Sequence, residues 1–514
     1  MGADACERVG AGAQSAVVTV PAERTWPRQR IVVLALAAIA ILARSAIFIF
    51  RQQSYFDSDQ AVIGLMGKHL SEGRAFPLFL YGQNYILAVE AWMAAVSFKL
   101  FGVSVVTLKL PLLGVNLVIA YLLLRTLQRE AGLTPALAGM ASLFFIAAPP
   151  GTAAMLVEAS GVNIEPFLYT LLIWLTRRRP GWCGAIFAVG FMQREFTLYS
   201  LLSLGCIAAI TGELFTREAV RRALLGLRSA AEVWLVVTVA KQYSSAAGPG
   251  TSLADIRAPA NNVLELLTRI CFDQGTVGGG IWRLVSVHWT ELFGTRVQPL
   301  WQSAIDSNVT EGLPFAWVLI AGAMGLAVVR VAMSMARQKQ LRREELFVAY
   351  LTTVGLIGAA AFVIGRCGAQ GHVRYALPTV FAAIGLGAWF LSIERERWLR
   401  TVWIVLVAGW ASVSALSHAK LYAEYSSHPP AGTKLMLVRH LQARGIKYAI
   451  ADYWLAYYVS FVTKEQIIVA STDFTRILEY ERLFNQHRSE AVLISRTPCG
   501  DGRPVVPGLY LCPP

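Results

Sequence analysis

Charge is scarce in this chain of 514 residues: 15% are Asp, Glu, Lys or Arg, whereas 55% are hydrophobic. This balance excludes an ordinary soluble protein, in which about a quarter of the residues are charged. Repeated apolar runs that are long enough to span a bilayer explain it instead. The formal net charge of +14 does not require a nucleic-acid partner, because basic residues gathered on one side of a membrane produce the same excess. The composition predicts a multi-pass membrane protein.

Several chemical signatures are also missing. No Cys-x-x-Cys pair and no His/Cys spacing suggests a zinc site, and no Walker-type loop supports an ATP-driven pump. We find no internal repeat of the kind that secondary transporters show. Of the few cysteines, Cys183 and Cys206 fall in apolar runs and are expected to behave as small apolar residues. Cys499 and Cys512 lie in the polar tail, where an oxidising compartment would allow a disulfide.

Apolar runs alternate with basic clusters along residues 31–418. About eleven runs are expected to span the membrane: 31–50, 104–124, 133–149, 162–176, 182–193, 196–211, 230–246, 314–334, 345–364, 376–393 and 401–417. With this number, the arginine-rich clusters at 177–179, 217–228, 337–343 and 395–400 share one side. The positive-inside rule then places the tail 1–30 in the cytoplasm. The loops 51–104 and 247–313 and the C-terminus would lie outside the cell membrane.

Residues 419–514 lack spanning runs and alternate between helical and strand patterns. Helices are predicted at 434–444 and 474–486, and strands at 448–451, 467–470 and 491–494. Such alternation predicts a small α/β domain outside the membrane. The expected fold is thus an all-α polytopic membrane domain followed by a small extracytoplasmic α/β domain.

The stretch Tyr55-Phe56-Asp57-Ser58-Asp59-Gln60-Ala61 follows the first span and places two carboxylates at a membrane surface. Residues 62–70 have the pattern of a short amphipathic helix, so Asp59 would lie in its first turn, where the helix dipole favours an anion. The simplest structural interpretation is that Asp57 or Ser58 caps this helix. One cap needs only one residue, so capping explains Asp59 less well.

The order of these parts resembles the GT-C fold glycosyltransferases that use polyprenol-phosphate sugars, particularly the bacterial family 39 or protein-mannosyltransferase-like group. The layout is similar over most of residues 30–420, while specific motifs are confined to about 55–111 and 372–378. These motifs are Asp59-Gln60-Ala61, Phe76-Pro77, Tyr81-Gly82-Gln83, Glu90-Ala91, Lys99-Leu100-Phe101-Gly102 and Lys109-Leu110-Pro111. One departure is Gln60, which stands where the family usually has Glu.

The resemblance implies an inverting transfer, in which an acceptor attacks the anomeric carbon of a sugar attached to a lipid phosphate. This reaction needs a general base for the acceptor and a cation for the departing phosphate. Asp59 is the candidate base. Asp57 is the candidate second carboxylate, or a ligand of a divalent cation such as Mg²⁺ or Mn²⁺. A paired acid is not required, because lipid phosphate is already a good leaving group.

The candidate phosphate site lies at His372-Val373-Arg374-Tyr375, where a late span begins on the external side. An arginine there can bind phosphate oxygens bidentately, and a tyrosine lies at headgroup depth. The family often has such an Arg-Tyr pair. The alternative is an interfacial anchor whose side chain snorkels to the headgroups. Arg194 and Arg366 are further candidates, because intramembrane charge often marks a site, although Arg194 can instead pair with Glu195.

Acceptor and sugar recognition are assigned to the external loops. Glu158 and Glu165 flank the second loop, where GT-C enzymes often place another acidic residue; the alternative is a solvated loop charge. In the first loop, the resemblance makes Tyr81, Gln83 and Glu90 candidates for sugar or acceptor contact.

Two further features have a structural alternative. Asp452-Tyr453-Trp454 follows a predicted strand, where α/β sheets bind ligands. Together with Tyr457 and Tyr458, it could stack a sugar or simply dock the domain on the membrane part. His69 could bind a metal, but a lone histidine is more often packed.

Three classes of function remain. The first is a membrane glycosyltransferase that moves a sugar from a polyprenyl-phosphate donor to a lipid, glycan or protein acceptor with inversion. The second is a transporter or flippase of lipid-linked sugars. The third is a non-catalytic factor in the assembly of envelope polysaccharide. The external carboxylates at a helix start and the external domain favour the enzyme.

Overall fold

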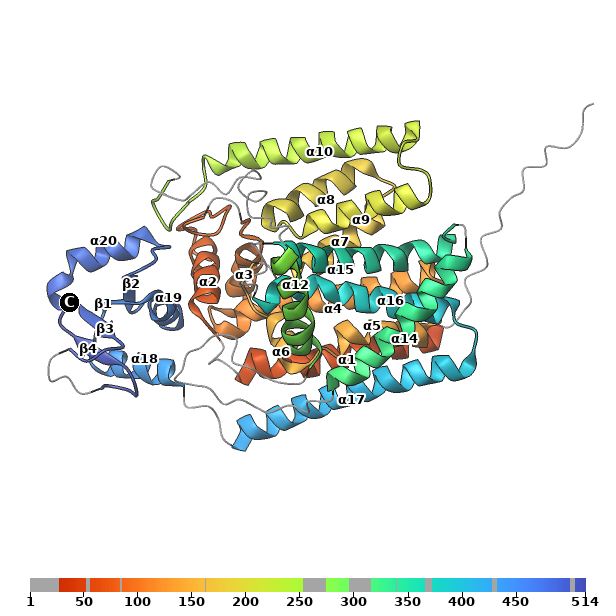
Figure 1. Cartoon of the computed structure of the whole chain (residues 1–514). Coiled ribbons are helices and arrows are strands. Elements are labelled where there is room, and N and C mark those ends of the chain that lie inside the picture. The colour runs from red at the N-terminus through yellow and green to blue at the C-terminus, as the bar shows by residue number, and fades with distance from the viewer. Residues whose placement is uncertain are drawn as a thin grey trace, which may run out of the picture.

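The long apolar helices of the chain lie side by side in one bundle (Figure 1). The computed structural model describes residues 27–51, 56–83, 86–161, 163–252, 274–294, 316–338, 340–365, 372–427, 432–499 and 504–514. Within these ranges, seven helical segments are long and apolar enough to cross a membrane. They are α1 (Pro27–Ala46, continued by a π-helical turn to Arg51), α4 (Val105–Glu130), α10 (Arg217–Lys241), α14 (Ala316–Arg337), α15 (Leu346–Ile364), α16 (Val380–Ile393, preceded by the 3-10 turn η7, Val373–Thr379) and α17 (Arg397–Ser427).

Four shorter helices coincide with the remaining predicted spans: α5 (Pro135–Ile146), α7 (Glu165–Thr176), α8 (Pro180–Gln193) and α9 (Thr197–Ile210). Every predicted span therefore falls on a helix, and the polytopic helical fold is confirmed. Helices of 12 to 14 residues reach only about 20 Å at a rise of about 1.5 Å per residue. A bilayer core is about 30 Å thick. By length, seven helices among the described residues can span the membrane fully, whereas about eleven spans were predicted.

Helix α10 begins earlier than the sequence pattern predicts. The span was expected near residue 230, after a basic loop, but the helix starts at Arg217 and includes the arginine cluster. Thr216 caps its N-terminus, and the carboxylate of Glu218 pairs with Arg222 one turn on at 2.8 Å. None of its residues is buried, and Figure 1 shows it on the outside of the bundle beside α8. These local contacts explain why the basic segment is helical.

Two helices of the segment 51–104, the predicted first external loop, pack at one end of the bundle: α2 (Ser58–Ser71) and α3 (Val89–Phe101). The helix predicted at 62–70 is present, but it is not amphipathic, because α2 is buried from Gln60 to His69. Both α3 and α19 of the C-terminal domain pack against it. Gly64 makes this packing close, because a Cβ at that position would clash with the Phe461 ring.

Short helices complete this end of the bundle: α6 (Pro150–Met155), α12 (Gln274–Arg283) and α13 (Trp289–Phe293). Of the predicted external loop 247–313, only 247–252 and 274–294 lie within the described residues. Helix α13 is anchored to the bundle, because Trp410 Nε1 donates a hydrogen bond of 2.8 Å to the carbonyl of Phe293.

The C-terminal residues form a four-stranded sheet with the strand order β2-β1-β3-β4. Strands β1 (Tyr448–Ala451), β2 (Ile468–Ser471) and β3 (Val492–Ser495) are parallel, and β4 (Tyr510–Cys512) is antiparallel to β3. The helices of this domain are α18 (Thr433–Ala443), α19 (Tyr453–Val462) and α20 (Leu478–Gln486). The predicted α/β elements are all present, while α19 and β4 were not predicted.

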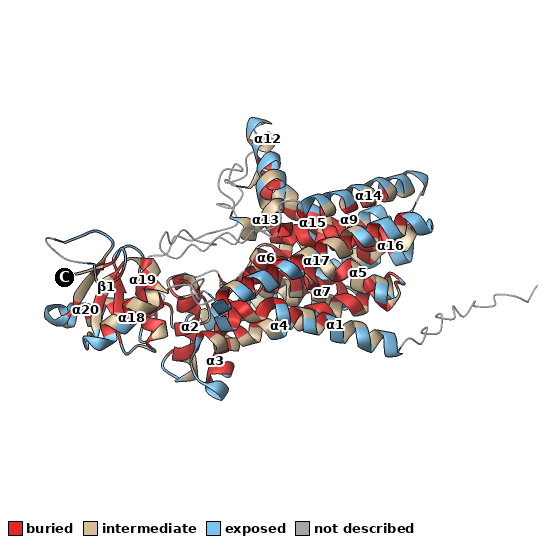
Figure 2. Ribbon diagram, turned by 90° about the horizontal axis from the view of Figure 1, so that it is seen from below, coloured by how far each residue is buried: buried red, intermediate tan, exposed pale blue. Residues whose placement is uncertain are grey.

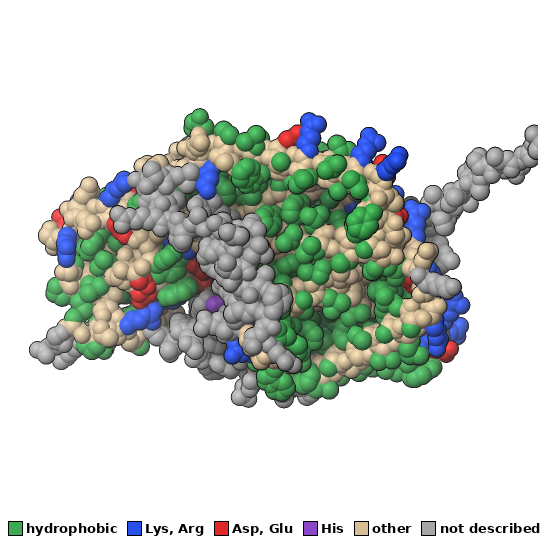
Figure 3. Space-filling model, turned by 45° about the horizontal axis from the view of Figure 1, so that its top comes forward, with side chains coloured by type: hydrophobic (Ala, Val, Ile, Leu, Met, Phe, Trp, Pro, Cys, Tyr) green, Lys and Arg blue, Asp and Glu red, His purple; other side chains and the backbone are tan. Residues whose placement is uncertain are grey.

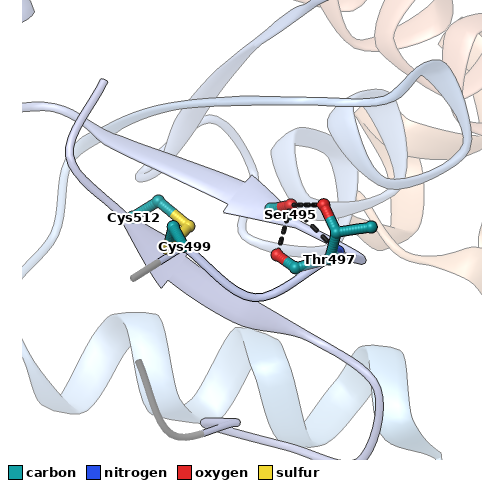
Figure 4. Close-up of a disulfide and its surroundings, with 4 residues drawn as sticks. All are labelled: Ser495, Thr497, Cys499 and Cys512. Carbon is teal, nitrogen blue, oxygen red and sulfur yellow. Dashed lines mark hydrogen bonds between the residues drawn. A yellow bond between two sulfur atoms is a disulfide. The ribbon is translucent and has the colours of Figure 1, made fainter. Parts of the chain in front are cut away.

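A disulfide joins Cys499 to Cys512 (Figure 4). It ties the segment that follows β3 to the last strand, across a sequence separation of 13. Beside it, Thr497 N donates a hydrogen bond of 3.0 Å to Ser495 Oγ, which closes a turn at the end of β3. The two tail cysteines therefore pair with each other, whereas Cys183 and Cys206 are free.

Burial and charge are distributed along the long axis of the molecule. Figure 2 shows buried residues extending from α19 and β1 through α2 into the helix bundle. Figure 3 shows hydrophobic side chains over the middle of the bundle, and Lys and Arg side chains at the end farthest from the C-terminal domain. Helix α14 ends there at Arg337 and α17 begins there at Arg397.

Candidate active site

Asp57 is the N-cap of α2, as the capping interpretation predicts. Its Oδ1 accepts a hydrogen bond of 3.0 Å from Gln60 N, and its Oδ2 is buried without a hydrogen-bond partner. Burial raises the pKa of Asp57 to about 6, and the negative charge of nearby Asp59 adds to the shift. Asp57 therefore combines a structural contact with one carboxylate oxygen that the protein leaves unpaired.

Asp59 lies in the first turn of α2 and is only half-buried. Its Oδ1 accepts a hydrogen bond of 2.6 Å from the hydroxyl of Tyr453, the first residue of α19. This contact crosses from the C-terminal domain to the first external loop. Asp59 is thus oriented by a group that is far away in the sequence.

Glu158 joins the two aspartates from the loop after α6. It is buried and accepts a hydrogen bond of 3.1 Å from Asn163 Nδ2. Burial raises its pKa to about 8, and the charge of Asp57 raises it further, whereas Arg374 and Lys109 oppose the shift. The structure therefore brings Glu158 into the same group of charges as the aspartates, which excludes a freely solvated loop charge.

Hydrogen bonds attach the loop that carries Glu158 to α2 and α3. Gln60 Oε1 accepts from Ala159 N at 3.4 Å, and Glu90 Oε2 accepts from Gly161 N at 2.7 Å. Gln60, the departure from the family pattern, thus serves this backbone contact. The carboxyl of Glu90 is buried against Glu165, and burial followed by the charge of Glu165 raises the pKa of Glu90 well above its usual range. In this structure Glu90 positions the loop and is not open to a sugar.

The predicted phosphate-binding residues also gather at this end of the bundle. Arg374 lies in η7, half-buried, and its guanidinium is 5.4 Å from the ring centroid of Tyr375. Arg194, which ends α8, donates a hydrogen bond of 3.5 Å to the Tyr375 hydroxyl and pairs with Glu195 at 3.6 Å. The ring of His372 lies 6.3 Å from that of Tyr375. Two arginines therefore flank one tyrosine next to the carboxylates.

Lys109 adds a third cation, which is not among the predicted site residues. It lies on α4, is buried, and donates a hydrogen bond of 3.2 Å to the carbonyl of Phe48. Its positive charge opposes the raised pKa of Glu158. The motif Lys109-Leu110-Pro111 was the signal in the sequence that could have identified it.

Tyr81 and Gln83 lie apart from this group of charges. The Tyr81 side chain is fully buried, with its hydroxyl 3.2 Å from His69 Nδ1. With its amide oxygen turned toward Arg476, Gln83 accepts hydrogen bonds of 2.9 and 3.0 Å from that guanidinium. The first contact lies within the segment 51–104, and the second joins this segment to the C-terminal domain. Contact with a sugar remains a prediction for these two residues.

The other candidates make structural contacts. His69 Nε2 lies 2.8 Å from the Glu465 carboxylate, and Asp452 caps α19 and pairs with Arg496 at 2.9 Å. The hydroxyl of Tyr457 accepts a hydrogen bond from Arg476 N, and the ring of Tyr458 packs against that of Phe56. The docking interpretation of these aromatics therefore describes their contacts. Arg366 lies outside the described residues.

A metal ion has an incomplete ligand set in this site. Across the described residues, no group of three or more His, Cys, Asp and Glu side chains is placed to hold a metal ion. Asp57 offers one unpaired oxygen, since its other oxygen caps α2. We therefore assign no step of the chemistry to a metal, and metal binding at Asp57 remains a prediction.

Comparison with known proteins identifies the fold. No protein-family model and no curated protein matches the sequence. Among solved structures, ArnT from Cupriavidus metallidurans bound to undecaprenyl phosphate is 11% identical, with a TM-score of 0.52 over 91% of this chain and 94% of ArnT. The apo form of ArnT gives 13% identity and a TM-score of 0.53, covering 90% and 92% of the two chains. The Archaeoglobus fulgidus oligosaccharyltransferase is 10% identical, with a TM-score of 0.51 over 91% of this chain and 69% of its own length.

The chain has the GT-C fold. The similarity to GT-C structures extends over the helix bundle and into the C-terminal region, since it covers nine-tenths of the chain. The resemblance that the sequence motifs suggested is therefore confirmed at the level of the fold. Within the GT-C frame, the carboxylates of the first external loop, Glu158 and Arg374 all come from segments at the same end of the bundle.

Proposed function

We propose that this protein is a membrane glycosyltransferase that moves a sugar from a polyprenyl-phosphate donor to an extracytoplasmic acceptor with inversion. The observation that carries the proposal is the single cluster of Asp57, Asp59, Glu158 and Arg374. Glu158 lies within electrostatic reach of the other three, and Asp59 within reach of Asp57 and Arg374. A general base and a phosphate-binding cation are the two groups that the reaction needs. The fold supports the same conclusion, because ArnT with this fold has been solved bound to undecaprenyl phosphate.

Asp59 acts as the base in this mechanism. It takes the proton of the acceptor as the acceptor oxygen or nitrogen forms a bond to the anomeric carbon. The bond between that carbon and the phosphate oxygen breaks on the opposite face, so the configuration inverts. Of the carboxyls in the cluster, Asp59 is the least enclosed, since Asp57 and Glu158 are both buried.

Arg374 and Arg194 bind the phosphate in this mechanism. The lipid phosphate departs with an additional negative charge, and guanidinium groups stabilise such an anion with charge-assisted hydrogen bonds. Tyr375 lies between the two arginines and fixes their separation through one hydrogen bond and two cation–π contacts. Glu158, whose pKa is about 8, is neutral at neutral pH and does not repel the phosphate.

We propose that the protein lies in the cell membrane and that its active site faces outward. Lys and Arg side chains gather at the end of the bundle farthest from the C-terminal domain (Figure 3), as expected for the cytoplasmic side. The C-terminal domain contains a disulfide, which persists in oxidising compartments. Both observations support an N-terminus in the cytoplasm and a C-terminal domain outside.

A transfer assay tests the proposal. The purified protein is reconstituted in liposomes with one undecaprenyl-phosphate-linked radiolabelled sugar per reaction and with envelope lipids and glycans as acceptors. We expect release of undecaprenyl phosphate and movement of the label to an acceptor, and neither product with the Asp59→Asn variant. Labelled donor that crosses the bilayer with its glycosyl bond intact would instead support the flippase. If every donor stays intact on its own side, the enzyme proposal is wrong.

A further inference from the structure

Helix α19 of the C-terminal domain contacts three residues of the stretch that begins α2: Phe56, Ser58 and Asp59. The Tyr453 hydroxyl donates to Asp59 Oδ1 at 2.6 Å, and the backbone N–H of Tyr458 donates to Ser58 Oγ at 3.3 Å. The ring of Phe56 packs against that of Phe461 with centroids 5.4 Å apart. These contacts extend from Phe56 to Asp59. The C-terminal domain therefore packs directly on the stretch that contains the candidate base.

Tyr453 is held in place independently of Asp59. Its backbone N–H donates to Asp473 Oδ1 at 2.8 Å, and Asp452 just before it caps the helix. Its ring makes edge contacts with Trp454, Tyr457 and Phe474, with centroids 5.1 to 5.7 Å apart. Burial raises the pKa of the Tyr453 phenol, so the hydroxyl keeps its proton and remains a donor. The rigid partner in the pair is therefore the tyrosine.

A second contact holds the other end of α2. Glu465, which follows α19, accepts from Lys68 at 2.5 Å and from His69 at 2.8 Å, both in the last turn of α2. Arg74 pairs with the same carboxylate at 2.7 Å, and Tyr480 donates to it at 2.9 Å. The C-terminal domain thus contacts α2 at its first and last turns, which fixes the direction of the helix relative to Tyr453.

From these contacts we propose that the C-terminal domain completes the active site, and that Tyr453 is a positioning residue for the base Asp59. This inference rests on the proposed function. The hydroxyl occupies one carboxylate oxygen of Asp59 and restricts the rotation of the side chain. The other oxygen is then left to accept the proton of the acceptor.

The Tyr453→Phe variant tests the inference because it keeps the ring contacts and removes only the hydroxyl. We expect turnover to fall by about tenfold or more, the scale of a hydrogen bond to a charged group, with the KM for the donor unchanged. Tyr448→Phe is the matched control: it removes a hydroxyl from β1 of the same domain, from a ring that stacks on His487. It should leave turnover and the KM unchanged.

The double variant Asp59→Asn/Tyr453→Phe separates positioning from general stability. If Tyr453 acts through Asp59, the double variant should be no slower than Asp59→Asn alone, because contacting residues that act together are not additive. Additive losses, or wild-type turnover in Tyr453→Phe, would overturn the inference.

A third measurement does not depend on transfer activity. Modification of Asp59 by a water-soluble carbodiimide, followed by mass spectrometry, should become severalfold faster in Tyr453→Phe and stay unchanged in Tyr448→Phe. If the wild-type protein transfers no sugar, the proposed function fails, and the labelling then decides the contact by itself. Equal labelling in all three proteins contradicts the positioning role.

Discussion

At the residue scale, the two aspartates of α2 make different contacts although they are only two positions apart. Asp57 gives one oxygen to the helix cap and is buried, whereas Asp59 is half-buried and bonded to a tyrosine from another domain. A helix needs one capping residue, so the structural role falls to Asp57. Asp59 remains the better candidate for chemistry.

Substitution of each aspartate by asparagine should therefore affect turnover and stability differently. Asp59→Asn is nearly isosteric, so the protein should fold normally, but its turnover should fall by about 100-fold or more, the scale of a general base. Asp57→Asn keeps an oxygen that can cap α2 and should have an unchanged melting temperature. If Asp57 binds a divalent cation, its variant should also lose activity and recover partly with added Mg²⁺ or Mn²⁺. An active Asp59→Asn with an inactive Asp57→Asn would move the base to Asp57.

Arg374 allows a direct test of donor binding. Arg374→Ala should weaken the binding of undecaprenyl phosphate, measured by calorimetry in detergent, by about 2 kcal/mol or more, because a charge that pairs with the phosphate is lost. Arg374→Lys should recover only part of the affinity, since lysine lacks the planar fork of donors. Arg228→Ala, on the exposed face of α10, is the control. Unchanged affinity in Arg374→Ala would support the interfacial anchor.

The buried carboxyl of Glu158 should make stability depend on pH. Its pKa is raised to about 8 in the folded protein and is about 4.3 in an unfolded chain. Between these values the folded state binds more protons than the unfolded state, so its contribution to stability is complete below about pH 4.3 and is lost as the pH rises toward 8. Glu158→Gln, which stays neutral, should therefore melt progressively higher than wild type as the pH rises through this window. Parallel melting curves would show that Glu158 ionises normally.

At the scale of elements, α2 is the helix on which the site depends, and close packing holds it. Gly64 faces the Phe461 ring of α19, and a Cβ at Gly67 would lie 2.9 Å from the Ala94 Cβ of α3. Glycine at these positions lets the two neighbouring helices approach α2 closely. The charged groups at its ends then set the position of α2 along the helix axis.

Gly64→Ala should destabilise the contact between α2 and α19. The added methyl group would overlap an aromatic ring that is itself buried, and overpacking of this kind costs about 1–3 kcal/mol. We expect a lower melting temperature and slower turnover, because Tyr453 would move relative to Asp59. Gly114→Ala on α4, where a Cβ meets nothing within 4 Å, should have no such effect. Equal behaviour of the two variants would contradict the close packing.

Elements with a clear hydrophobic period could be predicted from the sequence. Elements that are buried on every side could not. Apolar runs located all the spanning helices, and the strand at 448–451 was predicted with the bounds that β1 has. Helix α19 was missed because Tyr453 to Phe461 are almost all buried, which removes the polar face that gives a helix its period. Helix α2 was predicted to be amphipathic, but it is buried on all sides. Nothing in its own sequence shows that α19 covers it.

Some features of the candidate site could likewise be predicted from the sequence, and others could not. Asp59, Glu158 and Arg374 could be chosen from the sequence because charge is rare near a membrane, and the fold places them together. The pairing of Asp59 with Tyr453 joins residues 394 positions apart. No local pattern contains such a contact, so it required the structure.

At the scale of the whole molecule, the site lies between two bodies with different chemistry. The helix bundle supplies the carboxylates and arginines and presents apolar side chains along its length (Figure 3), as a lipid bilayer requires. The α/β domain supplies Tyr453 and is closed by a disulfide. The alternation of the helices carries the basic ends of α14 and α17 to the opposite end of the molecule from this domain. These features together define a direction across the membrane.

This direction can be measured by labelling single cysteines in intact cells, in a variant from which the native free cysteines have been removed. Ser489→Cys lies on an exposed turn of the C-terminal domain, and Gln340→Cys is exposed between α14 and α15 at the basic end of the bundle. A membrane-impermeant maleimide added outside should modify the first and not the second, because only the first is expected to face the oxidising side. After permeabilisation both should react, which shows that position 340 is accessible. Labelling of position 340 alone in intact cells would invert the topology, and it would place the carboxylate cluster on the cytoplasmic side, together with any sugar donor that it uses.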